Sequence, residues 1–110
     1  MPDPGFVEFC VEQLSVIGPV TARNMFGGAG LYHRGVMFAL IANDVLYLKA
    51  DTSSEAAFAE EGMEPFIYHG KKRKPVRMTY WQAPEFLFDD PDAMAEWAGR
   101  AFAVAQAAKR

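Results

Sequence analysis

The sequence has few residues that could build a disulfide or a metal site. Cys10 is the only cysteine, and His33 and His69 are the only histidines. A single cysteine cannot form an internal disulfide, which fits a protein of the reducing cytoplasm. Zinc sites need three or four converging ligands, and no Cys-x-x-Cys or His-x-x-x-His spacing occurs. We therefore expect no metal and no cofactor, and we expect both histidines to be solvated side chains beside turns.

Long apolar runs and a basic leader are also lacking. The longest uncharged apolar run, Gly35 to Ala42, is far too short to cross a bilayer. The first residues, MPDPGFVEF, contain no basic segment followed by an apolar one, so no signal peptide is visible. These absences predict a cytoplasmic protein that does not bind a membrane.

Positive charge is scarce. Eleven Lys and Arg residues stand against 14 Asp and Glu residues, and the formal net charge is −3. A domain dedicated to nucleic-acid binding is usually strongly basic, so the overall charge argues against that class. A local basic patch would still be compatible with it.

Nothing in the sequence predicts catalysis. A nucleophile needs a neighbouring base, but Cys10 lies on a predicted helix beside Phe6 and Leu14, where a small core residue is expected. Ser53 and Ser54 are expected to cap a helix. We therefore expect a protein that is not an enzyme.

The spacing of apolar residues and helix caps predicts several helices. Asp-Pro at 3–4 begins a helix that Gly-Pro at 18–19 ends, and a second Asp-Pro begins the longest helix, over 91–108. Thr21 is expected to cap a short turn of helix over 21–25. Thr-Ser-Ser-Glu at 52–55 matches a capping box that opens another helix.

Strand-like runs occupy the middle of the chain. Three of them, 29–33, 36–42 and 45–50, are separated by Arg-Gly and Asn-Asp, which suit tight hairpin turns. Two more, 64–69 and 75–82, flank a polar loop. We therefore predict one α+β domain over residues 1–110. It has two layers, an antiparallel sheet of about five strands (a three-strand meander plus a hairpin) packed against amino- and carboxy-terminal helices.

The glycine cluster Gly27-Gly28-Ala29-Gly30 could suggest a phosphate-binding loop. A Walker-type loop ends in Gly-Lys-Ser/Thr, but here Leu31 follows the last glycine. The dinucleotide-binding fingerprint lies between a strand and a helix, whereas these glycines precede a strand. We interpret them as structural, allowing a tight helix-to-strand transition and close backbone packing.

A basic loop between the last two strand-like runs leaves two interpretations open. Its side chains could contact phosphates, with Tyr68, Tyr80 and Trp81 as stacking partners, or it could be a solvated hairpin loop. The basic residues of this region are Lys71, Lys72, Arg73, Lys74 and Arg77.

Four segments, taken in order, resemble the TfoX amino-terminal domain family. They are ARNMFGGAGLY, GVMFALIANDVLYLKAD, EPFIYHGKKRKPVRMTYWQAPE and DPDAMAEWAGRA. The resemblance covers nearly the whole chain, from about Pro19 to Ala105. It implies an α+β domain with an antiparallel sheet packed on helices, in agreement with the pattern of the residues.

The resemblance also implies a function. Named members of the family regulate competence for DNA uptake and act in transcriptional activation together with another regulator, not as enzymes. They carry a second, carboxy-terminal domain, so we expect this chain to correspond to the amino-terminal domain alone. The family supplies no catalytic residue and no cofactor. We therefore expect a regulatory module that binds another protein, with direct nucleic-acid binding through residues 71–74 as the alternative.

Three residues are candidates for the contact with that protein. Arg23 is the residue of the glycine-rich segment least explained by packing, and it would either pair with a carboxylate or be exposed beside Tyr32 and Tyr47. Arg and Tyr are enriched where proteins bind each other. A homodimer is a further expectation, with the aromatic-rich strand 76–82 as the pairing surface.

Overall fold

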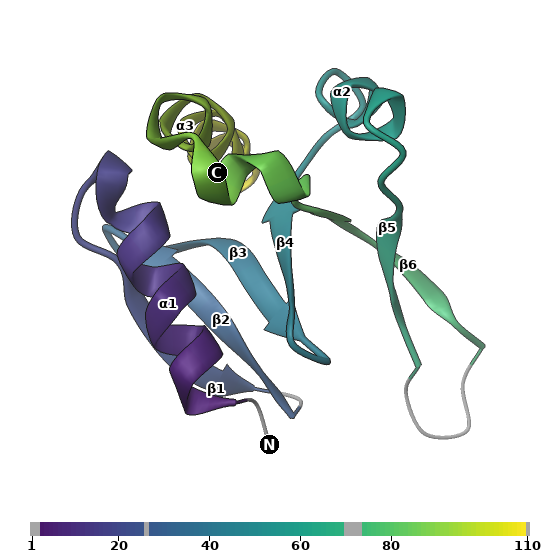
Figure 1. Cartoon of the computed structure of the whole chain (residues 1–110). Coiled ribbons are helices and arrows are strands. Elements are labelled where there is room, and N and C mark those ends of the chain that lie inside the picture. The colour runs from purple at the N-terminus through teal and green to yellow at the C-terminus, as the bar shows by residue number, and fades with distance from the viewer. Residues whose placement is uncertain (1–2, 26, 70–73, 110) are drawn as a thin grey trace.

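The computed structural model describes residues 3–25, 27–69 and 74–109. Within them, one antiparallel sheet of six strands, in the order β1-β2-β3-β4-β6-β5, carries helices on one side (Figure 1). The helical elements are α1 (Pro4–Leu14), η1 (Ser15–Ile17), α2 (Glu55–Glu60), η2 (Glu85–Asp89) and α3 (Pro91–Ala108). The strands are β1 (Thr21–Met25), β2 (Gly28–His33), β3 (Val36–Ala42), β4 (Val45–Lys49), β5 (Pro65–Tyr68) and β6 (Val76–Gln82). The predicted α+β class, with an antiparallel sheet against helices, is confirmed.

The sixth strand arises where a turn of helix was predicted. Thr21–Met25 is β1, which pairs antiparallel with β2 from Thr21 opposite Tyr32 to Met25 opposite Gly28. Gly27 has a φ of 75° and reverses the chain between the two strands. A single turn of helix is costly to nucleate, and pairing with β2 satisfies the same backbone groups better. The prediction of a helix over 21–25 is therefore wrong.

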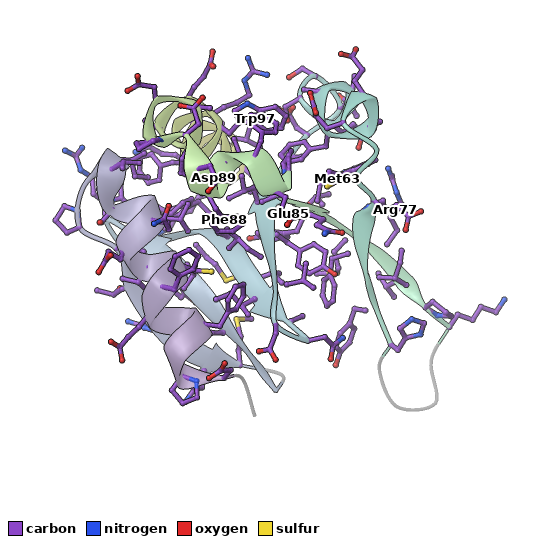
Figure 2. The ribbon with its side chains drawn as sticks, in the orientation of Figure 1. Met63, Arg77, Glu85, Phe88, Asp89 and Trp97 are labelled. Carbon is purple, nitrogen blue, oxygen red and sulfur yellow. The ribbon has the colours of Figure 1, made fainter. Side chains whose placement is uncertain are left out.

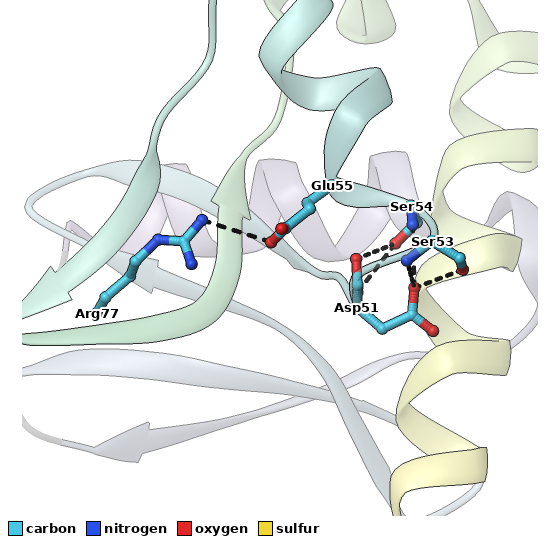
Figure 3. A network of polar contacts seen from close by, with 5 residues as sticks. All are labelled: Asp51, Ser53, Ser54, Glu55 and Arg77. Atoms are coloured by element: carbon cyan, nitrogen blue, oxygen red, sulfur yellow. Dashed lines mark hydrogen bonds and ion pairs between the residues drawn. The ribbon is translucent and has the colours of Figure 1, made fainter.

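The expected helix starts are largely confirmed. The carboxylate of Asp3 accepts a hydrogen bond from the Gly5 N–H at 3.1 Å, and that of Asp90 accepts one from the Ala93 N–H at 3.1 Å. The start of α2 differs from a capping box. There the Asp51 carboxylate accepts from the backbone N–H of Ser53 and of Ser54, both at 3.0 Å (Figure 3).

The core lies between the helices and one face of the sheet. Leu31, Ala39, Leu48 and Trp81 are register partners across β2, β3, β4 and β6, and all are buried. The buried residues of α3 are mostly alanines, which let the helix approach the sheet closely. Trp97 of α3 lies on the side of that helix facing α2 (Figure 2), and its ring meets the Phe58 ring edge-on at 5.0 Å.

Cys10 and His33 are both part of this interior. Cys10 is fully buried, as expected, and burial raises the pKa of its thiol to about 12. His33 is only 7% exposed; its Nδ1–H donates to the Pro19 carbonyl at 2.7 Å, and its ring contacts Phe102. The expectation of a solvated His33 is wrong, because residues distant in sequence enclose the ring. His69 is exposed, as expected.

The glycines have the structural role inferred from the sequence, although they join two strands and not a helix to a strand. A Cβ on Gly28 would lie 2.0 Å from the backbone oxygen of Ile41. A Cβ on Gly30 would lie 2.7 Å from Sδ of Met25 and 2.8 Å from Sδ of Met37. The close approach of β2 to β3 therefore requires the absence of a side chain at Gly28, whereas Gly30 leaves space that the two methionine side chains fill.

No helix within the described residues is both long enough and apolar enough to cross a membrane.

If the glycines are structural, substitution by alanine should have opposite effects on stability at two positions. Gly28→Ala should lower the free energy of unfolding by at least about 2 kcal/mol, because the new methyl group meets backbone that cannot move aside cheaply. Gly99→Ala on α3, where an added Cβ meets nothing within 4 Å, should raise it by about 0.5–1 kcal/mol. Urea unfolding followed by circular dichroism measures both. Equal effects at the two positions would contradict the steric account.

Candidate functional site

The register divides the sheet into two faces. Arg23, Gly30, Leu40, Tyr47 and Gln82 are successive partners across β1, β2, β3, β4 and β6. Side chains of directly paired residues share one face, and this row alternates with the core row beneath the helices. We call this second face the open face. The helices α1 and α3 both lie on the other side of the sheet (Figure 1).

The open face is apolar although none of the described helices covers it. Leu40 is only 7% exposed and Tyr80 only 8%. Around them lie side chains that are each partly buried. These are Met25, Tyr32, Met37, Tyr47 and Phe66.

The sheet coils enough to bring its two edge strands together on this face. Met25 of β1 and Phe66 of β5 line one recess of about 50 Å³, whose floor includes Gly28 and Leu40. The Phe66 ring also lies 5.0 Å from the Tyr47 ring. The open face is therefore a concave aromatic and methionine surface and not a flat sheet.

The charges of the strands are all positive. The described strands carry three charged residues, Arg23, Lys49 and Arg77, and no carboxylate. Each cation lies over an aromatic ring: Arg23 is 5.1 Å from the centre of Tyr32, Lys49 is 5.1 Å from Tyr80, and Arg77 is 5.4 Å from Trp81. Such contacts contribute about 0.5–1 kcal/mol each at exposed sites and hold both groups in place.

The three cations differ in what else they contact. Arg77 lies on the helical side, where its guanidinium forms an ion pair with Glu55 of α2 at 3.4 Å (Figure 3). The Lys49 ammonium donates to the Thr79 hydroxyl. Burial lowers the pKa of Lys49, while Asp51 acts in the opposite direction. Arg23 has no ion pair with any described residue, so its charge is available at the open face.

The structure brings two of the three candidate contact residues together. Arg23 and Tyr32 touch, and Arg23 lies on an exposed edge strand, not at a helix end. Tyr47 lies in the same cross-strand row as Arg23 but three strands away, which corresponds to about 14 Å. All three residues are therefore on one face without forming one cluster.

Sequence reasoning missed the other members of this face. Period-two alternation could have placed Met37 beside Tyr32, since β2 and β3 are joined by a tight turn. No local pattern shows that Met25 and Phe66 line one recess, because 40 residues of chain and the coiling of the sheet separate them.

The candidate nucleic-acid residues are only partly described. Lys71, Lys72 and Arg73 lie outside the described residues, and Lys74 is exposed. The rings proposed for stacking are mostly enclosed, with Trp81 7% exposed and Tyr80 8% exposed.

The strand proposed for self-association lies inside the sheet. Val76–Gln82 is β6, which has β4 on one side and β5 on the other, so the edge strands are β1 and β5. In the described part of the chain, no three His, Cys, Asp or Glu side chains lie close enough together to hold a metal ion.

Comparisons with known proteins agree with the resemblance found in the sequence. Residues 12–105 match the TfoX N-terminal domain. The chain is 32% identical over 78 residues to the DNA transformation protein TfoX1 of Aliivibrio fischeri, covering 71% of this chain and 37% of that protein. It is 31% identical over 67 residues to the DNA transformation protein TfoX of Haemophilus influenzae, covering 60% of this chain and 31% of that protein. The chain thus spans about a third of the length of the curated relatives it matches.

Tyr80 makes the stability of the open face depend on pH. Burial, with a smaller contribution from Tyr32, raises the pKa of Tyr80 from 10.0 to about 12. The unfolded chain loses this proton first, so the free energy of unfolding should fall as pH rises from about 10 to about 12. Tyr80→Phe should make that fall shallower, as measured by urea unfolding across this range. An unchanged slope in the variant would show that Tyr80 is not held in its neutral form.

Proposed function

The chain belongs to the TfoX N-terminal domain family, and on this premise we propose that it is a non-enzymatic regulatory module that binds another protein through the open face. The bound protein acts in transcription regulation in the cytoplasm. The observation that carries the proposal is a concave sheet face of partly buried aromatic and methionine side chains with a free cation at its edge.

The residue types of the open face suit protein recognition. Tyr and Arg are enriched among the residues that contribute most to protein interfaces. Methionine side chains are flexible and polarisable, so Met25 and Met37 can adapt to the shape of a bound surface. Tyr32 is held in position by Arg23, which lowers the entropy cost of ordering it on binding.

The charge of the face indicates the chemistry of the bound protein. The strands offer Arg23 and Lys49 at this face and no carboxylate. An apolar surface bordered by Asp or Glu is therefore the complementary surface, since opposite charges steer association and suppress wrong partners.

The names of the relatives connect this module to a process. Both are DNA transformation proteins, and the chain matches only about a third of each. We propose that this chain supplies a protein-binding domain to the regulation of DNA transformation. DNA binding through residues 71–74, with Arg77 nearby, is the alternative. Arg77 already forms an ion pair with Glu55, so this cation is less available to a phosphate, which favours the protein partner.

Site-specific photo-crosslinking in intact cells tests the proposal. A benzophenone side chain introduced at Tyr47 should give a covalent adduct with one transcription regulator, identified by mass spectrometry. The same group at Glu60, exposed on α2 on the helical side, is the matched control and should give little of that adduct. Arg23→Glu should reduce the adduct at position 47 several-fold, because it reverses the only free charge on β1.

Other results would count against the proposal. Equal adducts from positions 47 and 60 would show that the open face is not the interface. An adduct with DNA and not with protein would favour the alternative.

A further inference from the structure

A second surface with the opposite charge lies on the helical side of the sheet. It is a groove of about 460 Å³ between α1, η2 and the beginning of β4. Val45, Leu46 and Ala83 form part of its floor. We call it the acidic groove. Its lining reaches Gln82 at the end of the open-face row, but its carboxylates and phenylalanines lie on α1, on η2 and in the turn before β4.

Three phenylalanines line the acidic groove. The Phe9 ring stacks on Phe6 of the same helix at 6.4 Å and on Phe88 of η2 at 5.5 Å. Phe9 is nevertheless 43% exposed, so this aromatic stack is incompletely covered. An exposed aromatic cluster beside a cleft is typical of a surface that another molecule covers.

Every charge that lines the groove is negative. The carboxylates are those of Asp44, Glu85 and Asp89, and no Lys or Arg is among the lining residues. Figure 2 shows Glu85, Phe88 and Asp89 together at this place on the helical side. Within the described residues neither Glu85 nor Asp89 forms an ion pair.

We propose that the acidic groove docks a basic amphipathic helix of a partner protein, with an apolar side chain against the phenylalanine stack and Lys or Arg side chains against the carboxylates. The proposal goes beyond the function assigned to the open face and does not depend on it. The attraction combines apolar burial with charge complementarity and with cation–π contacts to the phenylalanine rings.

The sheet explains why the docked segment is a helix. β4, at the floor, lies between β3 and β6, so the floor presents no free strand edge. An extended segment would leave its own backbone N–H and C=O groups unpaired against this surface, whereas a helix satisfies them internally.

Charge argues against α1 of a second copy of this chain as the occupant. The α1 helix contains Glu8 and Glu12 and no Lys or Arg, and the whole chain carries a net charge of −3. A second copy therefore offers no basic helix of the required kind from this end of the molecule.

Fluorescence anisotropy with a labelled amphipathic helical peptide of Leu and Lys tests the proposal. A matched peptide with Glu in place of Lys should not bind in this groove, so any binding of it at the open face should be unchanged by Phe9→Ala. Glu85→Gln combined with Asp89→Asn should weaken binding of the Lys peptide about tenfold, as expected for loss of charge-assisted contacts. Phe9→Ala should weaken it similarly, and because Phe9 is 43% exposed this variant should still fold.

The control removes two negative charges from a surface outside the groove. Glu60→Gln combined with Glu61→Gln, on exposed positions at the end of α2, should change the affinity by less than about twofold. Equal weakening by both double variants would reduce the effect to net charge and overturn the proposal. Failure of the Lys peptide to bind, or weakening of Glu-peptide binding by Phe9→Ala, would overturn it as well. Sedimentation showing self-association that the Glu85 and Asp89 variants abolish would instead identify a second copy as the occupant. Tighter binding of the Lys peptide by Arg23→Glu, with no effect of the Glu85 and Asp89 variants, would place the peptide on the open face and overturn the proposal.

Discussion

The helices cover one face of the sheet, and the other face has to enclose its aromatic and methionine side chains without them. It does so by coiling, so that Met25 of β1 and Phe66 of β5 line one recess. The backbone of β3 approaches Gly28 closely, where a Cβ would collide with the backbone oxygen of Ile41, and the sulfurs of Met25 and Met37 pack over Gly30. The glycine-rich segment therefore helps to shape the concave surface, and it contributes to the proposed function through that shape. Neighbouring strands without side chains at two positions can twist more strongly than an ordinary pair.

Two surfaces of the molecule differ in the sign of their charge. The strands offer Arg23 and Lys49 to the open face, each against a ring, whereas the charged residues that line the acidic groove are all carboxylates. The net charge of −3 conceals this arrangement, because it averages over both sides. Such an arrangement suits a module that contacts two surfaces of opposite character, since each side repels the surface that fits the other.

Much of the fold could be predicted from the sequence because its determinants are local. Asp-Pro pairs mark both long helices, and in the two hairpin turns Gly35, Asn43 and Asp44 adopt the positive φ values that their residue types favour. β1 was missed because its identity depends on pairing with β2 after the turn at Gly27. The burial of His33 was missed because Phe102, 69 positions later, completes its surroundings. For the candidate site, Arg23 and Tyr32 could be named in advance, but the shape of the surface depends on sheet coiling that no short segment encodes.

Methionine oxidation footprinting in intact cells and on the purified chain is the most direct test of the claim that the open face is an interface. Met25 and Met37 lie on that face and are partly buried in the isolated chain. Met63, partly buried but packed against the core on the helical side, provides an internal reference. The account predicts that Met25 and Met37 are oxidised more slowly in cells than in the purified chain, while Met63 is not. Equal relative oxidation of all three methionines in the two settings would contradict it.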